Sequence, residues 1–530
     1  MLATGLFVFT NETGFSHEGE GFGWDVSVAL AAFLILLLTA SRTVLPAWTT
    51  RVAFACAAVV GGIAAFRVGE DDVTGVAIVV LVVSLLALVA SRSGLPPLLL
   101  LASLAANYSL MRAIADPDAA TPLPAIEAIV ALALPVVTLP FAIRAEATRV
   151  LRWGVWLTGT GMLGLLTERY FIRRSPLVAP DDVLLTIGGA ALLLASTVLR
   201  RDRVAPILAA TGVAAIVLVM LLMLQGAEYV SDTAVSIDEA ARDVLRGENP
   251  YTSVDILNAL HVRGLPEKLV TPFSDSKEVE RRFPYPAGSF IPSTLAIALG
   301  IQDVRYGFLA VLAALYLTLI FRLPRALAPY VSALALVDIM ADRQVALAGV
   351  EPSWALLLAL ALTLPKASGI VSGLAAAARQ TAWLYLPWLA ADRARLGRAA
   401  LVRWLAAVAV VFAVVNGPFA VGAPGEWLSG STAPLFAPYV PLGFGAIRFS
   451  TDGPLPFAPR TAYTVAMGLG YLVALWAYWR DRPSWRYGAA VMPVAPLYFG
   501  WRSLQNYFMF APVFLVSLIA VEPEERSQRM

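Results

Sequence analysis

The sequence has little of three residue types that many enzymes use for chemistry: one cysteine, two histidines and few charged side chains. Cys56 lies in an apolar run, so it has no partner for an intrachain disulfide or a thiolate metal site. His17 and His261 are too few for a histidine metal centre or a catalytic triad. Any acid–base chemistry is therefore expected to use carboxylates, and no metal site or cofactor is predicted.

The charged share is only 14%, whereas 59% of the residues are hydrophobic, against roughly 45–50% in soluble domains. This composition excludes a soluble fold. Apolar runs of about 15 to 22 residues recur from residue 26 to residue 520, and about 20 such residues cross a bilayer as a helix. The sequence predicts an all-α, polytopic transmembrane bundle of about 17 helices.

The net charge is only +2, and the arginines stand in small groups between the apolar runs, so no nucleic-acid footprint is visible. Short loops rich in Lys and Arg stay cytoplasmic. This rule orients the eighth run, residues 204–224, outward, and it places the longest polar segment, residues 225–286, outside. By the same count, residues 392–398 and 480–486 lie inside, while 379, 421–460 and 502–507 lie outside.

This polar segment contains the signals of a short helix. The run from Ser236 to Glu239 reads as a capping box, with Ser236 as N-cap, and Gly247 and Pro250 end the helix. Asp232 is expected just before this helix. A loop of such length between packed helices is expected to be folded and functional.

The loop also resembles a known family in its order of motifs. Asp232 is followed by Glu-Ala-Ala-Arg at 239–242, by Leu-Arg-Gly-Glu-Asn-Pro-Tyr at 245–251 and by Phe-Pro-Tyr-Pro at 283–286. This order resembles the first external loop of GT-C superfamily glycosyltransferases, most of all the polyprenyl-phosphate-mannose-dependent enzymes of glycosyltransferase family 87. The family's second proline of Tyr-Pro-Pro is Ala287 here, and Thr233 and Ala234 replace its usual aromatic residues.

The resemblance covers roughly residues 205–520 and implies a GT-C-like catalytic domain at 204–530, preceded by a transmembrane extension of about seven helices at 1–203. It implies transfer of a sugar, mannose by this likeness, from a polyprenyl phosphate to a lipid, glycan or protein acceptor. The implied enzyme lies in the plasma membrane with its active site on the extracytoplasmic face. Asp232 would be the general base that deprotonates the acceptor hydroxyl, with inversion at the anomeric carbon.

The residues support a carboxylate base independently, because a hydroxyl nucleophile needs a proton acceptor and histidine is nearly absent. Asp232 can also be a solvated loop carboxylate or a helix cap. Glu228 and Asp238 are the alternative carboxylates. Asp238 is expected in the first turn of the helix, where the dipole favours a carboxylate without any catalytic role.

A lipid phosphate at the outer interface requires nearby cations. Arg379, followed by Gln380, is the first candidate because it stands between two short apolar segments, although snorkelling explains it also. Surface ion pairs are the alternative for the other cations. The remaining predicted substrate-binding residues are Asn249, Tyr251, Arg281, Arg282, Tyr285, Arg343, Arg502, Asn506 and Tyr507.

Aromatic residues recur among many prolines and glycines at 421–459, including Trp427, Tyr439 and Phe444. Aromatic faces stack on sugars, so this stretch is a candidate acceptor platform, and interfacial anchoring explains it equally well.

Two other functions stay open. A secondary transporter would show repeated halves and charges at mid-membrane depth; no internal repeat is evident, although Asp338 and Glu351 lie near membrane depth. A lipid-linked polysaccharide polymerase or ligase also uses an external loop and many helices. In that class the large loop usually comes late, whereas here about nine crossings follow it.

Overall fold

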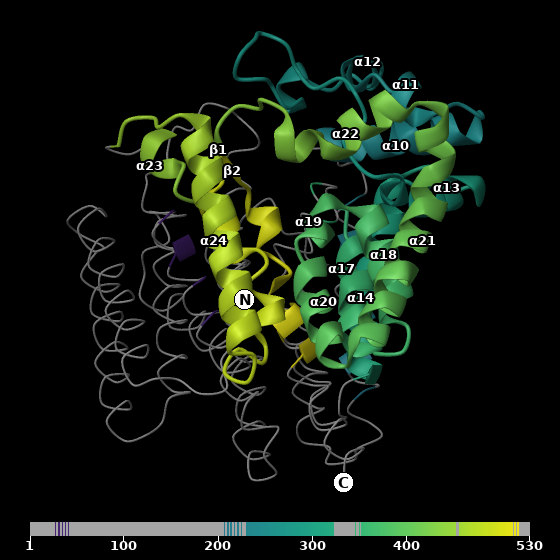
Figure 1. Ribbon diagram of the computed structural model, residues 1–530. Helices are drawn as coiled ribbons and strands as arrows, with labels where there is room; N and C mark the ends of the chain where they lie inside the picture. Colours follow the sequence, from purple (N-terminus) through teal and green to yellow (C-terminus); the bar gives the residue numbers. More distant parts are fainter. Residues whose placement is uncertain are drawn as a thin grey trace, which may run out of the picture.

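The computed structural model describes residues 231–322, 351–451 and 455–511, together with single positions at 27–41, 206–229, 345–349 and 513–518. Most of the predicted N-terminal extension, residues 1–203, therefore lies outside the described residues. The described part is mostly helical, as predicted (Figure 1).

The helices of the first half are α10 (Asp232–Leu245), α11 (Pro250–Ser253), α12 (Ile256–Val262), η4 (Glu267–Leu269), η5 (Ala287–Ser289), α13 (Ile291–Ala298) and α14 (Val304–Arg322). Those of the second half are α17 (Ser353–Thr363), α18 (Ser368–Ala378), α19 (Gln380–Trp383), α20 (Leu386–Arg395), α21 (Arg398–Gly422), α22 (Pro424–Phe436), α23 (Arg448–Thr451), α24 (Arg460–Arg480), η7 (Gly488–Ala490), η8 (Ala495–Phe499) and η9 (Gln505–Tyr507). The strands β1 (Leu442–Gly443) and β2 (Arg502–Ser503) pair in parallel.

These elements form two layers. Helices α14, α17, α18, α20, α21 and α24 stand side by side as a bundle, and α10 to α13 gather with α22 at its upper end in Figure 1. We call α10 to α13 and α22 the upper layer. The predicted outer loop thus forms a folded, helical layer, and it contains short helices as expected.

Three described helices are long and apolar enough to cross a membrane: α14, α21 and α24. Along α21 and α24 most side chains are apolar and exposed, including Val410, Val414, Leu469 and Val473. A helix with such a surface is stable in lipid because its backbone is satisfied internally. The other predicted crossings fall on shorter helices or outside the described residues, so the count of about 17 stays a prediction.

The predicted grouping of charged segments by side agrees with the arrangement of the helices. Helix α21 rises from Arg398 to the upper layer, and α24 descends from Arg460 to Arg480 (Figure 1). Residues 392–398 and 480–486 therefore lie at the end opposite the upper layer. Residues 421–460 begin and end near that layer, as the charge pattern predicts.

Glycines allow α18 to pack directly on α21. A Cβ atom added to Gly369 would lie 2.9 Å from the Cβ of Ala407, and one on Gly373 would lie 2.9 Å from the carbonyl oxygen of Val408. Gly369 and Gly373 form a Gly-x-x-x-Gly pattern, which lets the backbones of two membrane helices approach closely. This contact fixes the position of α18, whose C-terminal end leads into Arg379.

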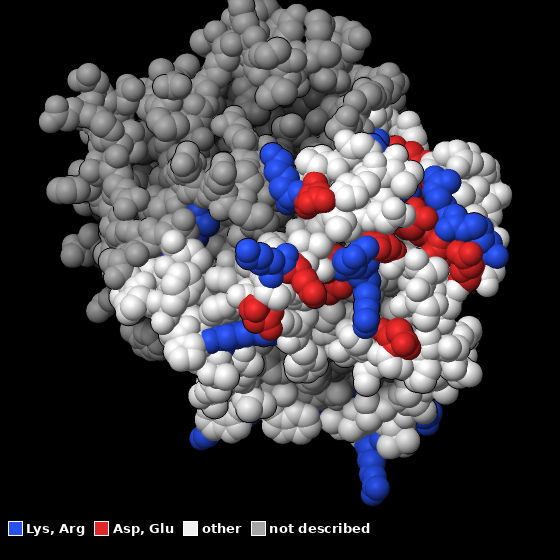
Figure 2. Space-filling model, turned by 90° about the horizontal axis from the view of Figure 1, so that it is seen from above, with Lys and Arg blue, Asp and Glu red and all other residues white. Residues whose placement is uncertain are grey.

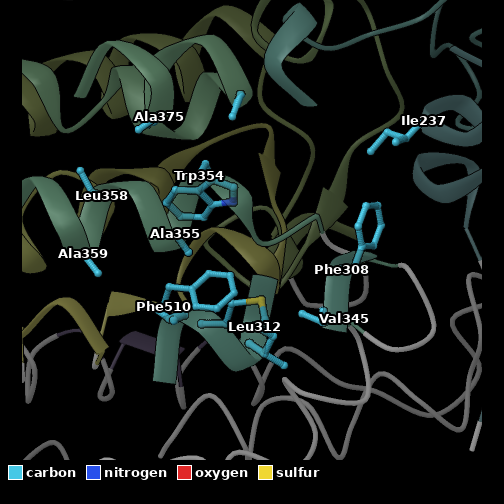
Figure 3. Close-up of a cluster of buried hydrophobic side chains, with 14 of the residues drawn as sticks. Ile237, Phe308, Leu312, Val345, Trp354, Ala355, Leu358, Ala359, Ala375 and Phe510 are labelled. Atoms are coloured by element: carbon cyan, nitrogen blue, oxygen red, sulfur yellow. The ribbon is translucent and has the colours of Figure 1, made fainter. Parts of the chain in front are cut away.

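The core of the bundle is aromatic and includes the C-terminal segment. Figure 3 shows Trp354 of α17 among side chains from α14, α18 and the chain near Phe510. The ring of Trp354 makes edge contacts with Phe510 at 5.5 Å and Phe514 at 5.8 Å between centroids. Edge-to-face geometry is the preferred arrangement of aromatic pairs. Burial of residues 508–511, 513 and 514 here holds the preceding residues 502–507 next to the bundle.

The predicted start of the loop helix was wrong. Helix α10 begins at Asp232, after an extended Ser231, and Ser236 lies inside it, where its hydroxyl donates to the Thr233 carbonyl oxygen. The capping box at Ser236 is therefore not formed. Apolar residues at 234, 235 and 237 are fully buried, so packing extends the helix by one turn toward its N-terminus. The predicted end is confirmed, because Gly247 follows with φ +80°.

We predict that Gly373→Val destabilises the fold by about 1–3 kcal/mol, because overpacking forces α18 away from α21. Gly468→Val on α24 is the matched control, since no atom lies within 4 Å of a Cβ there. Thermal unfolding of the purified chain in detergent measures both. Equal midpoints for the two variants would contradict the close contact.

Candidate functional site

Asp232 lies at the N-terminus of α10 and is partly buried. Its Oδ2 atom accepts hydrogen bonds from the backbone N–H of Thr271 at 3.1 Å and from the Thr271 hydroxyl at 2.8 Å. The helix dipole also favours negative charge at this end. The carboxylate is thus held in one orientation by groups from two separate segments.

Burial raises the pKa of the Asp232 carboxyl above its ordinary value, while the hydrogen bonds from Thr271 and the charge of Arg502 lower it. Desolvation is the largest of these effects, so the net shift is upward. A carboxylate with a raised pKa is a stronger base once ionised. The group is therefore suited to accept a proton.

Tyr285 connects Asp232 with Arg379. Its hydroxyl lies 2.9 Å from the Oγ1 atom of Thr233, and the guanidinium carbon of Arg379 lies 4.0 Å from the centre of its ring. Burial raises the pKa of Tyr285, and of the two charges Arg379 lowers it while Asp232 raises it. The Arg379 guanidinium therefore lies over this aromatic ring, and the residue next to Asp232 contacts the ring's hydroxyl.

Arg502 and Tyr507 belong to the same group. Burial raises the pKa of Tyr507, whereas the charges of Arg502 and Arg379 both lower it, so this hydroxyl is in the electrostatic field of both cations. We call Asp232, Tyr285, Arg379, Arg502 and Tyr507 the Tyr285 cluster. It combines one carboxylate, two guanidinium groups and two phenol rings, which can accept a proton, hold phosphate oxygens and contact an apolar ring face.

Two other predicted residues, Tyr251 and Gln380, hold the Phe-Pro-Tyr-Pro turn in place, and a third, Asn249, joins α11 to the end of α21. The Tyr251 hydroxyl donates to the carbonyl oxygen of Tyr285 at 2.7 Å. The Gln380 amide donates to the carbonyl oxygens of Pro284 at 2.8 Å and Ser431 at 2.7 Å. Asn249 caps α11 and donates to the carbonyl oxygen of Phe419 at 3.0 Å. Each of these side chains bonds to backbone carbonyl oxygens of the protein, so their observed role is to position the segments around the site.

Asn506 lies beside Tyr507 in η9, and its side-chain oxygen is buried. Within the described part of the chain this oxygen has no hydrogen-bond partner. A buried amide without a partner is costly in a folded protein. The side-chain oxygen of Asn506 is therefore free to accept a hydrogen bond, and its role in binding a sugar stays a prediction.

Several predicted residues lie away from the cluster. Asp238 is in the second turn of α10, not the first, and its carboxylate is paired with Arg242 at 3.2 Å and Arg263 at 2.6 Å. Arg281 is exposed and paired with Asp255. Arg282 is also exposed. Figure 2, which views the upper layer from above, shows Lys and Arg mixed with Asp and Glu over the described surface.

Two predicted residues, the alternative carboxylate Glu228 and the cation Arg343, lie outside the described residues. Among the residues that the structure does describe, no group of His, Cys, Asp and Glu has the arrangement of a metal site.

The sequence did not indicate how the loop is fixed above the bundle. Glu280 is buried, and its carboxylate accepts from the Tyr439 hydroxyl at 2.7 Å. The Tyr439 ring stacks on Phe273, with 5.5 Å between centroids, and the Arg502 guanidinium lies 4.9 Å from its centre. These contacts, with the pairing of β1 and β2, bring Arg502 to the segment that holds Asp232.

The missed residues are Thr271, Glu280 and Tyr439, which all act through partners far away in the sequence. Of these three, only Tyr439 was named in the sequence analysis, as part of the aromatic stretch at 421–459, and its contact with Glu280 was not predicted.

Comparison with protein-family models, with curated proteins and with solved structures found no match to this chain. The geometry of the cluster therefore carries the functional argument.

We predict that Tyr439→Phe lowers the free energy of unfolding by about 1–3 kcal/mol, because the Oε2 atom of the buried Glu280 carboxylate loses the Tyr439 hydroxyl, while Oε1 keeps the backbone N–H of Arg282. Tyr306→Phe is the control, since Tyr306 is 40% exposed. Thermal unfolding and protease sensitivity of residues 271–283 are the measurements. A Tyr439→Phe protein as stable as the control would show that the bond to Glu280 does not hold the loop.

Proposed function

We propose that this protein is a membrane-embedded glycosyltransferase of the GT-C type that transfers a sugar from a polyprenyl phosphate to an acceptor hydroxyl outside the cytoplasm. The observation that carries the proposal is the geometry around Tyr285, whose hydroxyl lies 2.9 Å from Thr233, the neighbour of Asp232, while the Arg379 guanidinium lies 4.0 Å from its ring centre. We propose mannose as the transferred sugar because the loop motifs resemble those of polyprenyl-phosphate-mannose-dependent enzymes. The donor, the acceptor and the surrounding lipid are the proposed partners.

The reaction is one displacement. The acceptor oxygen attacks the anomeric carbon, the bond from that carbon to the phosphate oxygen breaks, and the hydroxyl proton passes to the carboxylate of Asp232. Attack from the face opposite the phosphate inverts the configuration. The leaving polyprenyl phosphate carries one more negative charge than the phosphodiester donor did, so cations beside it stabilise the transition state.

Arg379 and Arg502 are suited to that task because a guanidinium donates several hydrogen bonds to phosphate oxygens. Each acts on the Tyr507 hydroxyl, so a phosphate near this residue would be in the field of both charges. The upper layer stands at one end of helices that are apolar and long enough to span a membrane. A lipid-linked donor reaches such a site from the bilayer with its isoprenoid chain still in lipid.

The transfer itself is tested with the purified chain in liposomes, labelled polyprenyl-phosphate-mannose and membrane extract as the acceptor source. We expect Asp232→Asn to lower the transfer rate by a factor of at least about 10² because the general base is lost. Asp255→Asn, a change of the same charge in the same loop, should keep the wild-type rate.

The folded-state pKa of Asp232 is raised above its unfolded value, so its ionisation at neutral pH costs stability. Asp232→Asn should therefore unfold at the wild-type temperature or higher. Full transfer activity in this variant would remove Asp232 from the mechanism. Movement of the labelled donor across the bilayer without any transfer would favour a transporter instead.

The pH dependence gives a second test. Transfer needs ionised Asp232, so the rate should rise with pH through the raised pKa of this carboxyl. Thr271→Val removes a hydrogen bond to the ionised form, so the acidic limb of the profile should move to higher pH. Thr271→Ser keeps the hydroxyl and should leave the limb in place. Superimposable profiles for the valine and serine variants would contradict the role of this bond.

A further inference from the structure

Glu351 is a buried carboxylate that the proposed mechanism does not use. It is fully buried ahead of α17, and its Oε1 atom accepts from the backbone N–H of Ser353 at 2.6 Å. Its Oε2 atom has no hydrogen-bond partner among the described residues. A buried carboxylate with an open acceptor is costly unless a cation lies near it.

The topology supplies that cation. Helices α17 and α18 have 11 residues each and form an antiparallel hairpin, so the residues before α17 and after α18 meet at its open end. Those residues are Glu351 and Arg379. Arg379 is the charged side chain that acts on the Glu351 carboxyl. Arg379 is itself 7% exposed, and its Nη1 atom is buried with no partner in the described part of the chain.

The two groups are therefore buried opposite charges at the same end of the hairpin, without a direct hydrogen bond between them, and each retains an unused hydrogen-bonding atom. In their ionised forms Asp232 and Glu351 carry two negative charges, and Arg379 and Arg502 carry two positive charges. A donor phosphodiester brings one further negative charge, whereas the product monoester brings up to two. The balance of charge beside the phosphate therefore decides how strongly the product is held relative to the donor.

We infer that Glu351 is the counter-ion of Arg379 and a specificity-determining residue of the phosphate site, which limits the affinity for a phosphate monoester relative to a phosphodiester. This inference rests on the proposed function. With Glu351 in place, Arg379 presents a partly neutralised charge that binds the donor but releases the more highly charged product. Without it, the full charge of Arg379 favours the monoester.

Binding of two defined probes tests this without requiring turnover. Farnesyl phosphate is the monoester, and its methyl ester is the phosphodiester; both are titrated into the full chain in detergent with intrinsic tryptophan fluorescence as the signal. In Glu351→Gln we expect the ratio of monoester to phosphodiester affinity to rise by about tenfold, as for one unit charge near a partly buried site. Glu426→Gln, an equal change at an exposed position of α22, should leave the ratio unchanged.

The outcomes separate the two proposals. A wild-type chain that binds neither probe would overturn the proposed phosphate site, and with it the donor assignment. A wild-type chain that binds both, with the same ratio in Glu351→Gln, would overturn the role of Glu351 alone. Glu351→Asp should keep a ratio close to that of the wild type, because it retains the negative charge.

A stability measurement covers the case in which Glu351→Gln does not fold. Removing one member of a buried pair leaves an uncompensated charge, whereas removing both does not. The double variant Glu351→Gln with Arg379→Gln should therefore unfold at a higher temperature than Glu351→Gln. A double variant that is no more stable than the single one would show that these residues are not a pair and would overturn the inference.

Discussion

The candidate site depends on the position of one side chain, Tyr285. Its carbonyl oxygen is held by the Tyr251 hydroxyl, its own hydroxyl meets Thr233 of α10, and its ring lies under the guanidinium of Arg379. These contacts come from a loop turn, from the upper layer and from the end of a bundle helix. A shift of the ring would separate the carboxylate of Asp232 from the cation at the end of α18.

Charge is the second constraint, since the cluster collects ionised groups where water is largely excluded. Such groups persist only if opposite charges and hydrogen bonds compensate for the lost hydration. Thr271 and Arg502 do this for Asp232. Burial outweighs them and leaves the pKa of Asp232 raised. The same desolvation therefore destabilises the ionised carboxylate and makes it a stronger base.

Much of the architecture could be predicted from the sequence, because apolar runs, arginine groups and the Gly-Pro end of α10 are local signals. The start of α10 could not, since burial of Val235 and Ile237 against other helices outweighed the cap expected at Ser236. Within the site, Asp232 and Arg379 were both predicted from the sequence, and the contacts of Tyr285 connect Arg379 with Thr233, the neighbour of Asp232. Arg281 was not, because Asp255 engages it at the surface. Thr271 and Glu280 act through partners in other segments, which no local pattern reveals.

The pairing of β1 with β2 has a mechanical consequence. The backbone N–H of Phe444 donates to the carbonyl oxygen of Ser503 at 2.8 Å, so the chain returns to its starting point after passing through α24. The excursion through α24 therefore begins and ends at one place, although Tyr478 alone of this helix is buried. Because Arg502 belongs to β2, the same pairing anchors the backbone of one cluster cation to the strand Leu442–Gly443.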